Sequence, residues 1–363
     1  MSENQRTISK SVTVKGNGLH TGVEAAITIK PAPINHGYVF KRLDLKGQPL
    51  VKAVAENVDT TERGTSLKKS NVRVQTIEHI LASLYGLGID NALMELNGPE
   101  VPILDGSAKY FVRAILDAGI KEQDSERKYF VLKEKIFYKD EKNGFEIVAF
   151  PDDNFSMDVH IDFNSKVLGN QYASLKNLSD FKSEIAQCRT FVFLHELEYL
   201  QTNNLIKGGD FDNAIIIMDR KVTQEELDRL AVLFNKPKIK VKSEGILNNV
   251  ELYFYNEPAR HKLLDLLGDM ALLGYHIKGR IIANKAKRHL KTIAGRLVRE
   301  LFRSLSESQL KIHSDILSLF DSILKQKRDS KNKIYSIHES HIYCMSKGKE
   351  HKTSEKTCQN FLH

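Results

Sequence analysis

Residues 261–269 read HKLLDLLGD, within a segment that the sequence marks as a helix at both ends. Pro258 suits the first helical turn, and Gly274 suits the position just past the last turn. Because a helix advances by about 100° per residue, three polar residues fall on one stripe: His261, Asp265 and Asp269. Apolar residues form another stripe, which can face a core. The helix therefore presents an imidazole and a carboxylate one turn apart, and a second helix can supply a further ligand.

An imidazole and a carboxylate at this spacing suit a catalytic metal site, because such sites use three nitrogen or oxygen ligands and leave one position open. The pair alone is weak evidence, because this spacing is more typical of a solvated helix face with an i,i+4 interaction. A second segment favours the metal. Residues 75–86, QTIEHILASLYG, have apolar residues at helical spacing and place Glu78 beside His79. The small Ala82 and Ser83 lie over this pair and leave it accessible. Histidine next to glutamate predicts a metal ligand beside a general base.

A series of short motifs follows in order along the chain: GNGLHTG at 16–22, PAP at 31–33, TIEH at 76–79, GIDN at 88–91, GPEVPILDGS at 98–107, CRTF at 188–191, KGGDFDNA at 207–214 and HKLLDLLGD at 261–269. Together they resemble the zinc-dependent UDP-3-O-acyl-N-acetylglucosamine deacetylases, which carry out the committed step of lipid A synthesis in Gram-negative bacteria. The resemblance spans roughly residues 5–284, and the order and spacing of the motifs argue against coincidence.

The resemblance implies that Zn²⁺ is held by His79, His261 and Asp265. Glu78 would be the general base of acetamide hydrolysis. Thr190 would hydrogen-bond the tetrahedral oxyanion, and Lys262 would contact the substrate or help to hold that charge. Each role fits its chemistry, because metal coordination lowers the pKa of water toward neutrality. A hydroxyl and an ammonium aimed at a developing oxyanion stabilise the transition state.

The amine leaving group also needs a proton. In the family the donor is commonly assigned to a histidine held by the aspartate of the G-D pair, here Asp269. The usual stretch resembles KSGHxLN, whereas this chain has KAKRHLKT at 285–292. When this stretch is aligned with the family pattern without a gap, Arg288 takes the histidine position. Arginine cannot give up a proton at physiological pH. We expect a loop adjustment to bring in His289. Otherwise Glu78 would be both base and acid, at a rate lower by roughly 10²- to 10⁴-fold.

Residues 191–213 are rich in aromatic and aliphatic side chains. In the family a small inserted element here forms a hydrophobic passage for the fatty acyl chain of the substrate. The residues expected to contact the substrate are Phe191, Leu19, His20, Gly208 and Gly209. The two glycines fit a tight turn or a close approach of backbone to ligand, and they fit an ordinary loop equally well.

Strands precede helices in each half of the chain, which favours an α+β fold over alternating βαβ units. Expected strands lie at 11–15, 25–30, 38–43, 91–96, 129–136, 145–150 and 157–163, and expected helices lie around 78 and near 108–118, 178–186 and 258–273. The resemblance implies two similar domains, each a β-sheet layered on two helices, with the active site between them. We expect an N-terminal domain at 1–122, a linker at 123–128, a C-terminal domain at 129–299 with the insert near 191–213, and a divergent basic tail at 300–363, either disordered or a remnant.

The composition of the 363 residues, 41% hydrophobic and 28% charged, is that of a soluble globular protein large enough for two domains. Three cysteines without C-x-x-C spacing favour free thiols and a reducing cytoplasm. Cys188 is expected to be a small buried hydrophobe. Residues 1–6 are polar, unlike a signal peptide, and no stretch reaches the roughly 18 consecutive apolar residues of a membrane span. A cytoplasmic location is therefore expected.

The net charge of +8 is concentrated late in the chain, with 19 Lys and Arg against 8 Asp and Glu from residue 278 onward. The basic run at 278–299 raises the alternative of a nucleic-acid-binding protein, but it has no interleaved aromatics and no recognised binding motif. No nucleic acid is therefore expected as a partner, and the resemblance implies a small nucleotide-sugar lipid precursor instead. Residues 285–289 support another alternative, a catalytically impaired homologue that still binds zinc and the nucleotide sugar. The sequence specifies neither acyl length nor oligomeric state.

Overall fold

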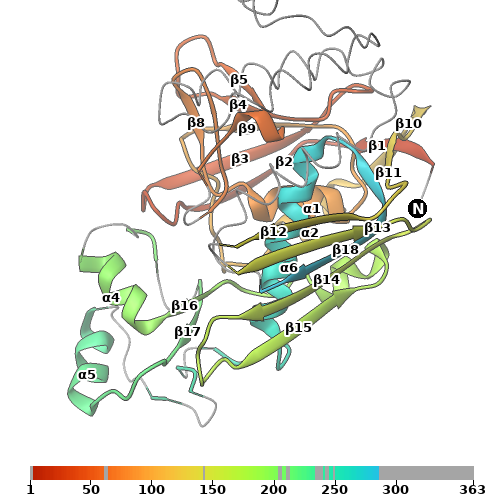
Figure 1. Ribbon diagram of the computed structural model, residues 1–363. Coiled ribbons are helices and arrows are strands. Elements are labelled where there is room, and N and C mark those ends of the chain that lie inside the picture. Colours follow the sequence, from red (N-terminus) through yellow and green to blue (C-terminus); the bar gives the residue numbers. More distant parts are fainter. Residues whose placement is uncertain are drawn as a thin grey trace, which may run out of the picture. The chain divides into compact units, whose positions relative to one another are not determined.

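The computed structural model describes residues 3–60, 64–141, 144–202, 207–209, 213–233, 240–241, 245–247 and 250–285. His289 and the tail predicted at 300–363 lie outside these ranges. The described part is a mixture of several sheets and a few helices, which confirms the α+β class (Figure 1). None of the helices described is long and apolar enough to span a bilayer.

A five-stranded sheet in the first half has the order β2-β3-β9-β4-β5. Its strands are β2 (Val12–Asn17), β3 (Glu24–Pro31), β4 (Tyr38–Arg42), β5 (Leu50–Lys52) and β9 (Ala92–Leu96). Alternate residues of β3 are buried because successive side chains point to opposite faces. On the other face Glu95 pairs with Lys30 and Lys41. One side of this sheet therefore faces the core, and the other is polar.

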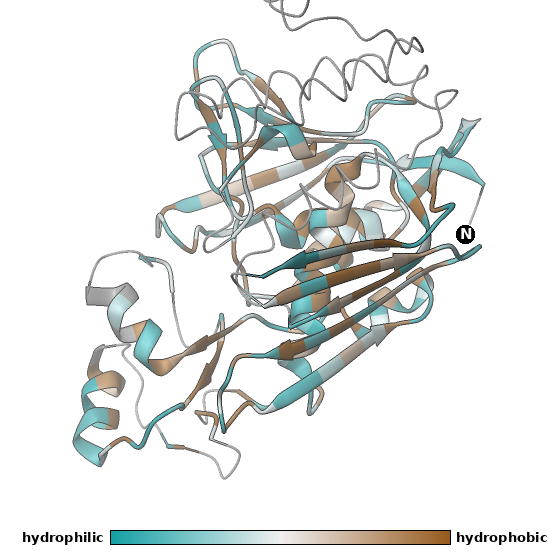
Figure 2. Cartoon of the chain, viewed as in Figure 1, coloured by the Kyte–Doolittle hydropathy of each residue, from teal (hydrophilic) through white to brown (hydrophobic). Residues whose placement is uncertain are grey.

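A second sheet repeats this topology with the order β12-β13-β18-β14-β15, and β11 is added as another partner of β18. Its strands are β11 (Tyr129–Val131), β12 (Ile136–Asp140), β13 (Phe145–Phe150), β14 (Phe155–Asp162), β15 (Asn170–Leu175) and β18 (His276–Asn284). In both sheets the successive neighbours are antiparallel, antiparallel, parallel and antiparallel. Brown and teal residues alternate along these strands in Figure 2.

The prediction of a single strand at 129–136 is wrong. The chain forms β11 and then, after a break, β12. Residues 133–135, Lys-Glu-Lys, are exposed between the two strands and carry no side chain that a core could bury.

The helices connect the cores of the two sheets. They are α1 (Glu78–Gly86), α2 (Lys109–Ala118), α3 (Phe181–Glu184), α4 (Leu194–Thr202), α5 (Gln224–Leu233) and α6 (Glu257–Met270), with 3-10 turns η1 (Ala55–Asn57), η2 (Leu178–Asp180) and η3 (Ala271–Leu273). The helix α1 packs on both α2 and α6, while α2 contacts β2 and α6 contacts β14 and β15. Every residue of α1 is buried. This packing brings α1 and α6 side by side, although 180 residues separate their motifs in the sequence.

Two predicted elements differ in extent from the structure. The helix expected near 178–186 is only the short pair η2 and α3. The expected linker at 123–128 is strand as far as Glu126, because β10 (Ile120–Glu126) pairs antiparallel with β1 (Asn4–Ile8). Polar residues hide this pairing from a pattern analysis, since backbone hydrogen bonds and not an apolar face hold the two strands together. The division into two domains remains a prediction.

A small sheet of β6 (Val58–Thr60), β7 (Ser66–Lys69) and β8 (Val72–Val74) precedes α1. The sequence patterns did not predict this sheet. These strands are short, and the segment just before β7 runs against the beginning of α1, where Ile77 donates its backbone N–H to the carbonyl of Thr65.

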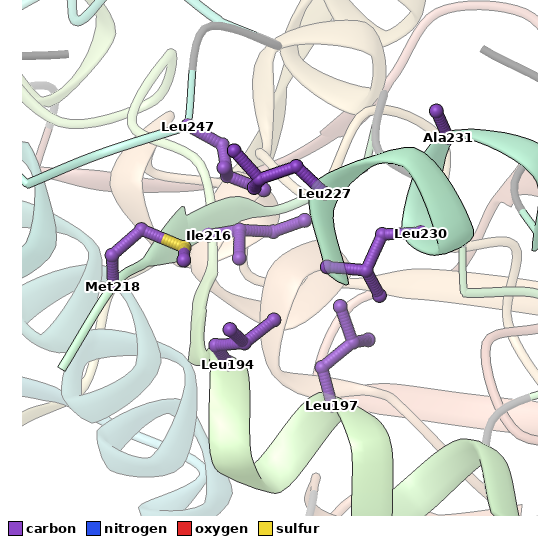
Figure 3. Close-up of a cluster of buried hydrophobic side chains, with 8 residues drawn as sticks. All are labelled: Leu194, Leu197, Ile216, Met218, Leu227, Leu230, Ala231 and Leu247. Carbon is purple, nitrogen blue, oxygen red and sulfur yellow. The ribbon is translucent and has the colours of Figure 1, made fainter. Parts of the chain in front are cut away.

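The insert has a hydrophobic core of its own. Its strands β16 (Phe191–Phe193) and β17 (Ile215–Ile217) are parallel, and α4 and α5 follow them in the chain (Figure 1). Figure 3 shows the buried side chains that meet between these elements: Leu194, Leu197, Ile216, Met218, Leu227, Leu230, Ala231 and Leu247. The packed unit thus extends well past residue 213, where the sequence analysis expected the insert to end.

Candidate metal centre and active site

Three potential metal ligands converge where α1 meets α6. Asp265 Oδ1 lies 3.3 Å from His261 Nε2 on the same helix and 3.6 Å from His79 Nε2 on the other helix. The two imidazole rings are nearly perpendicular, with centroids 5.0 Å apart. One ligand atom from each of the three residues lies within 4.8 Å of the others. The structure therefore brings together the three residues that the sequence analysis named.

The three side chains are buried, with exposed fractions of 4% for His79, 1% for His261 and 8% for Asp265. The alternative of a solvated helix face is therefore wrong for α6. Its polar stripe faces α1 because α6 is packed on both that helix and the second sheet. Buried polar groups without compensation are costly, so a stripe of this kind calls for paired or metal-bound groups.

The orientation of His261 leaves one ring nitrogen for a metal. Its Nδ1 lies 3.0 Å from the carbonyl oxygen of Cys188. A carbonyl can only accept, so Nδ1 donates and the lone pair of the neutral ring is on Nε2. Histidines that bind metals are commonly held in this way by a backbone carbonyl. Cys188 itself is fully buried, as expected, and burial raises the pKa of its thiol.

The protonation states of His261 and Asp265 also suit a cation. Burial lowers the pKa of His261 to about 4, so its imidazole is neutral near pH 7. Burial opposes ionisation of Asp265, but the neighbouring His261 and Lys262 outweigh it and lower the pKa of this carboxyl. A neutral imidazole and a charged carboxylate are the forms that bind metals. For His79, burial lowers the pKa. The Asp265 hydrogen bond and the Glu78 charge together raise this pKa by more than burial lowers it, so the net shift is upward.

Glu78 begins α1, directly before His79. The backbone N–H of Thr65 donates to its Oε2 at 2.9 Å. Burial is the main reason that the pKa of Glu78 is raised, with the His79 and Asp265 charges acting in opposite directions. Thr76, two residues earlier, has a φ of 58°, and its hydroxyl donates to Glu100 Oε1 at 2.9 Å. A β-branched residue rarely adopts this conformation, so the approach to α1 is held under strain.

Asp269 lies one turn beyond Asp265 and is also buried. Its Oδ1 accepts a hydrogen bond of 2.7 Å from the Thr65 hydroxyl. Its Oδ2 has no hydrogen-bond partner within the part of the chain that the structure describes. Burial is the main reason that the pKa of Asp269 is raised, to about 8. The Thr65 hydrogen bond lowers this pKa, and the nearby charge of Glu78 raises it.

Lys262 connects the metal ligands to an aromatic group. Its Nζ lies 2.6 Å from Asp265 Oδ2 and 5.8 Å from the centroid of the Phe191 ring. Phe191 in turn packs edge to face on Phe163 at 5.3 Å, and Phe163 lies 5.6 Å from Phe193. Phe193 directly precedes α4, the first helix of the insert, so a series of aromatic contacts extends from Lys262 toward the insert core.

Thr190 is held beside α6 by its neighbour Arg189. The Arg189 guanidinium and backbone N–H both donate to Glu257 Oε1 at 2.9 Å, and the fully buried Glu257 is the first residue of α6. The backbone N–H of Thr190 donates to Gly106 O, and its carbonyl accepts from Ile215. The CRTF motif is therefore tied to the helix that carries two of the metal ligands.

Leu19 and His20 belong to a loop centred on Glu100. This carboxylate, 1% exposed, accepts hydrogen bonds from the backbone N–H groups of His20 and Thr21 and from the Thr21 hydroxyl. It also accepts the Thr76 hydroxyl, so one buried group connects the loop to the segment before Glu78. Glu100 lies within the motif at 98–107, but its residue type and position in the sequence predicted no role for it.

Gly208 donates its backbone N–H to the Leu19 carbonyl at 3.0 Å. A Cβ at position 208 would stand 2.1 Å from the Gly18 carbonyl oxygen, which explains why this position has no side chain. Gly208 therefore permits a close approach between two loops of the chain.

Three functional candidates escaped the sequence analysis, namely Thr65, Glu100 and Glu257. None of them stands out in a periodic pattern, because each acts through a hydrogen bond to a residue distant in the chain. Glu257 carried one weak signal, since an acidic residue directly before Pro258 is typical of a helix start.

Comparisons with known proteins show which family the sequence resembles. The model of the family LpxC, UDP-3-O-acyl N-acetylglycosamine deacetylase, matches residues 5–239 and 233–303. Among curated relatives, a UDP-3-O-acyl-N-acetylglucosamine deacetylase of Teredinibacter turnerae is 37% identical over 302 residues, which cover 82% of this chain and 90% of the relative.

Two other relatives are named bifunctional enzyme LpxC/FabZ. The protein of Bacteroides thetaiotaomicron is 47% identical over 299 residues, and that of Porphyromonas gingivalis is 46% identical over 312 residues. The matches cover 82% and 86% of this chain, respectively. They cover 65% and 67% of the relatives, so the chain spans about two thirds of the length of these longer proteins.

Proposed function

The chain belongs to the UDP-3-O-acyl N-acetylglycosamine deacetylase family, and from this membership we propose that it hydrolyses the acetamide of UDP-3-O-acyl-N-acetylglucosamine, releasing acetate, in lipid A biosynthesis. The observation that carries the proposal is the convergence of His79, His261 and Asp265 beside the buried carboxylate of Glu78. Relatives with the deacetylase name support the substrate class.

The donor set fits a zinc ion. Two imidazoles and one carboxylate are typical of catalytic zinc sites, which leave another position open. The lone pair on His261 Nε2 and the charged state of Asp265 support this assignment. When bound, the ion would acidify a water molecule and polarise the acetamide carbonyl.

Glu78 is the proposed general base. Its carboxylate lies next to His79 in the chain and is held at Oε2 by the Thr65 N–H. A raised pKa brings a carboxylate closer to neutral pH, where a general base is most effective. In the proposed reaction a Glu78 oxygen accepts the proton of the attacking water.

Thr190 and Lys262 are proposed to stabilise the negative charge that develops on the carbonyl oxygen. The Lys262 ammonium is anchored by Asp265 at 2.6 Å, so it is fixed at the edge of the metal cluster. Thr190 is fixed by backbone bonds on both sides. Donors that are already oriented require no reorganisation when charge appears, which makes them effective.

The acyl chain is proposed to lie along Phe191 and the core of the insert. The contact of Phe191 with Phe163 and its nearness to Lys262 support this placement. Leu19, His20, Gly208 and Gly209 are proposed to contact other parts of the substrate, and the bond between Gly208 and Leu19 supports a common surface for them.

Protonation of the amine is assigned to His289, oriented by Asp269. The unpartnered Oδ2 of Asp269 supports the presence of a further hydrogen-bonding partner at this carboxyl group. Because this histidine is one residue later than the family pattern, a catalytically impaired chain that still binds zinc and nucleotide sugar is the competing candidate.

The test is acetate release from UDP-3-O-acyl-N-acetylglucosamine by the zinc-loaded chain, with and without a chelator. Glu78→Gln should abolish release, and the exposed Glu122→Gln should leave it unchanged. Comparing His289→Ala with Arg288→Ala identifies the acid: loss in the first alone supports His289. A zinc-loaded chain that binds the substrate without releasing acetate would overturn the proposal in favour of the impaired homologue.

A further inference from the structure

Thr65 connects two buried carboxylates on different helices. Its backbone N–H donates to Glu78 Oε2 at 2.9 Å, and its hydroxyl donates to Asp269 Oδ1 at 2.7 Å. Glu78 begins α1, and Asp269 lies near the end of α6. Building on the proposed function, we propose that Thr65 is a positioning residue, which orients the general base Glu78 and the aspartate Asp269 for the reaction.

The backbone around Thr65 is fixed against α1. Its carbonyl oxygen accepts the N–H of Ile77 at 3.2 Å, and its side chain is buried. Gly64, just before it, has a φ of 154°, and a Cβ there would stand 3.0 Å from Glu78 Oε1. Glycine therefore permits the close approach of this segment to the base. Because the backbone is held on both sides, the direction of the Thr65 hydroxyl is set by the fold.

The hydroxyl determines how Asp269 faces the site. One carboxylate oxygen is occupied by Thr65, whereas Oδ2 is buried and has no partner among the residues described. With Oδ1 anchored, rotation of the Asp269 carboxyl group is restricted, and Oδ2 points in one direction. Without the hydroxyl, Asp269 would lose its anchor and could rotate. Outer residues that orient the reacting groups typically contribute about 10- to 100-fold to activity.

A purely structural hydroxyl would make a different prediction. Thr7 provides the comparison, because it is equally buried, donates to Asn91 O at 2.8 Å and accepts from Ala32 N at 3.0 Å. Replacement of either threonine by valine should lower the stability of the protein, since each substitution leaves a buried polar group unpaired. Only Thr65 touches Glu78 and Asp269, so only its replacement should lower kcat.

The experiment measures kcat and KM for acetate release by the zinc-loaded full chain. Thr65→Val should lower kcat about 10- to 100-fold with little change in KM or zinc content. Thr65→Ser keeps the hydroxyl and should retain most of the activity. Thr7→Val should unfold more easily than the wild type and keep its kcat.

A double-mutant cycle with Asp269→Asn separates positioning from a general loss of structure. If Thr65 acts through Asp269, adding Thr65→Val to Asp269→Asn should reduce kcat little further. The inference would be overturned if the two substitutions lowered kcat by factors that multiply in the double variant. It would also be overturned if Thr65→Val were as active as Thr65→Ser. Either result would leave the deacetylase function intact. A wild-type chain that releases no acetate would overturn both.

Discussion

Gly268 of α6 lies against the backbone of Glu78, so closely that a Cβ at position 268 would stand 2.2 Å from the Glu78 carbonyl oxygen. The helix that carries His261 and Asp265 can therefore reach the helix that carries His79 only because position 268 has no side chain. The glycine of the HKLLDLLGD motif thus belongs to the geometry of the site as much as the polar residues do.

Gly268→Ala should destabilise the protein by about 1–3 kcal/mol, because the added methyl group overpacks the α1–α6 contact. In an ordinary helix interior the replacement of glycine by alanine would be stabilising, so the sign of the change in unfolding free energy already tests the prediction. Urea unfolding measures the effect, and titration with zinc should show weaker binding. Gly98→Ala is the control, since a Cβ there meets nothing within 4 Å. Equal stability of the two variants would contradict the prediction.

Arg189→Met should cost about 3–5 kcal/mol, because it leaves the fully buried Glu257 carboxylate without its cationic partner. Activity should fall as well, since Thr190 follows directly in the chain. The matched control is Arg113→Met, which removes an exposed ion pair of 3.8 Å with Asp117 and should change stability by less than about 0.5 kcal/mol. Thermal or urea unfolding measures the loss of stability in each variant. Similar losses of stability in Arg189→Met and Arg113→Met would refute the prediction.

His276 should make stability depend on pH below neutrality. It is buried and stacked on Tyr85, and burial, together with the charge of Arg127, lowers its pKa to about 3. Asp90 lies 3.6 Å from His276 Nε2, too far for a hydrogen bond, and is itself bound by Arg127.

Because the folded pKa of His276 lies below its ordinary value of 6.5, the unfolded chain binds the proton more readily. The contribution to stability is therefore fully present above pH 6.5 and is lost as the pH falls from there toward 3. His276→Phe, which keeps a ring on Tyr85, should show a shallower decline in unfolding free energy between pH 7 and 4. An unchanged slope would exclude this histidine as the source.

Leu230→Ala should loosen the insert, because Leu230 is 6% exposed and belongs to the insert core. A loss of about 2–5 kcal/mol is typical of such a substitution. Val232, on the same helix, is 83% exposed, so Val232→Ala provides a matched control with little expected effect. Amide hydrogen exchange along α5 measures the local opening. If the strands of the two large sheets open to the same extent, the insert is not an independent core.

Much of the local structure could be predicted from the sequence. Pro258 and Gly274 indicated the ends of α6 and its 3-10 extension, and the apolar spacing around Glu78 indicated α1. The strands β3, β9, β13 and β14 follow alternating patterns. These four strands and the largely buried β4 were placed within a few residues. Such patterns are reliable because burial of one face imposes a period on the chain.

Other elements carry no such pattern. The strands β1 and β10 are largely polar and are held by backbone pairing with each other, so the stretch expected to be a linker was partly strand. Glu100 and Glu257 are buried through hydrogen bonds to residues far away in the sequence. Periodicity cannot reveal a charged residue whose burial depends on partners that are distant in the sequence.

The sequence by itself determined which residues are chemically suited to bind a metal and which helices carry them, because residue type and helical spacing are local properties. Only the tertiary structure decided that His79 meets His261 and Asp265, that Gly268 allows this approach, and that Thr65 spans the two carboxylates. These relationships depend on the packing of α1 on α6, and contacts between segments so far apart are set by the shape and burial of the folded chain.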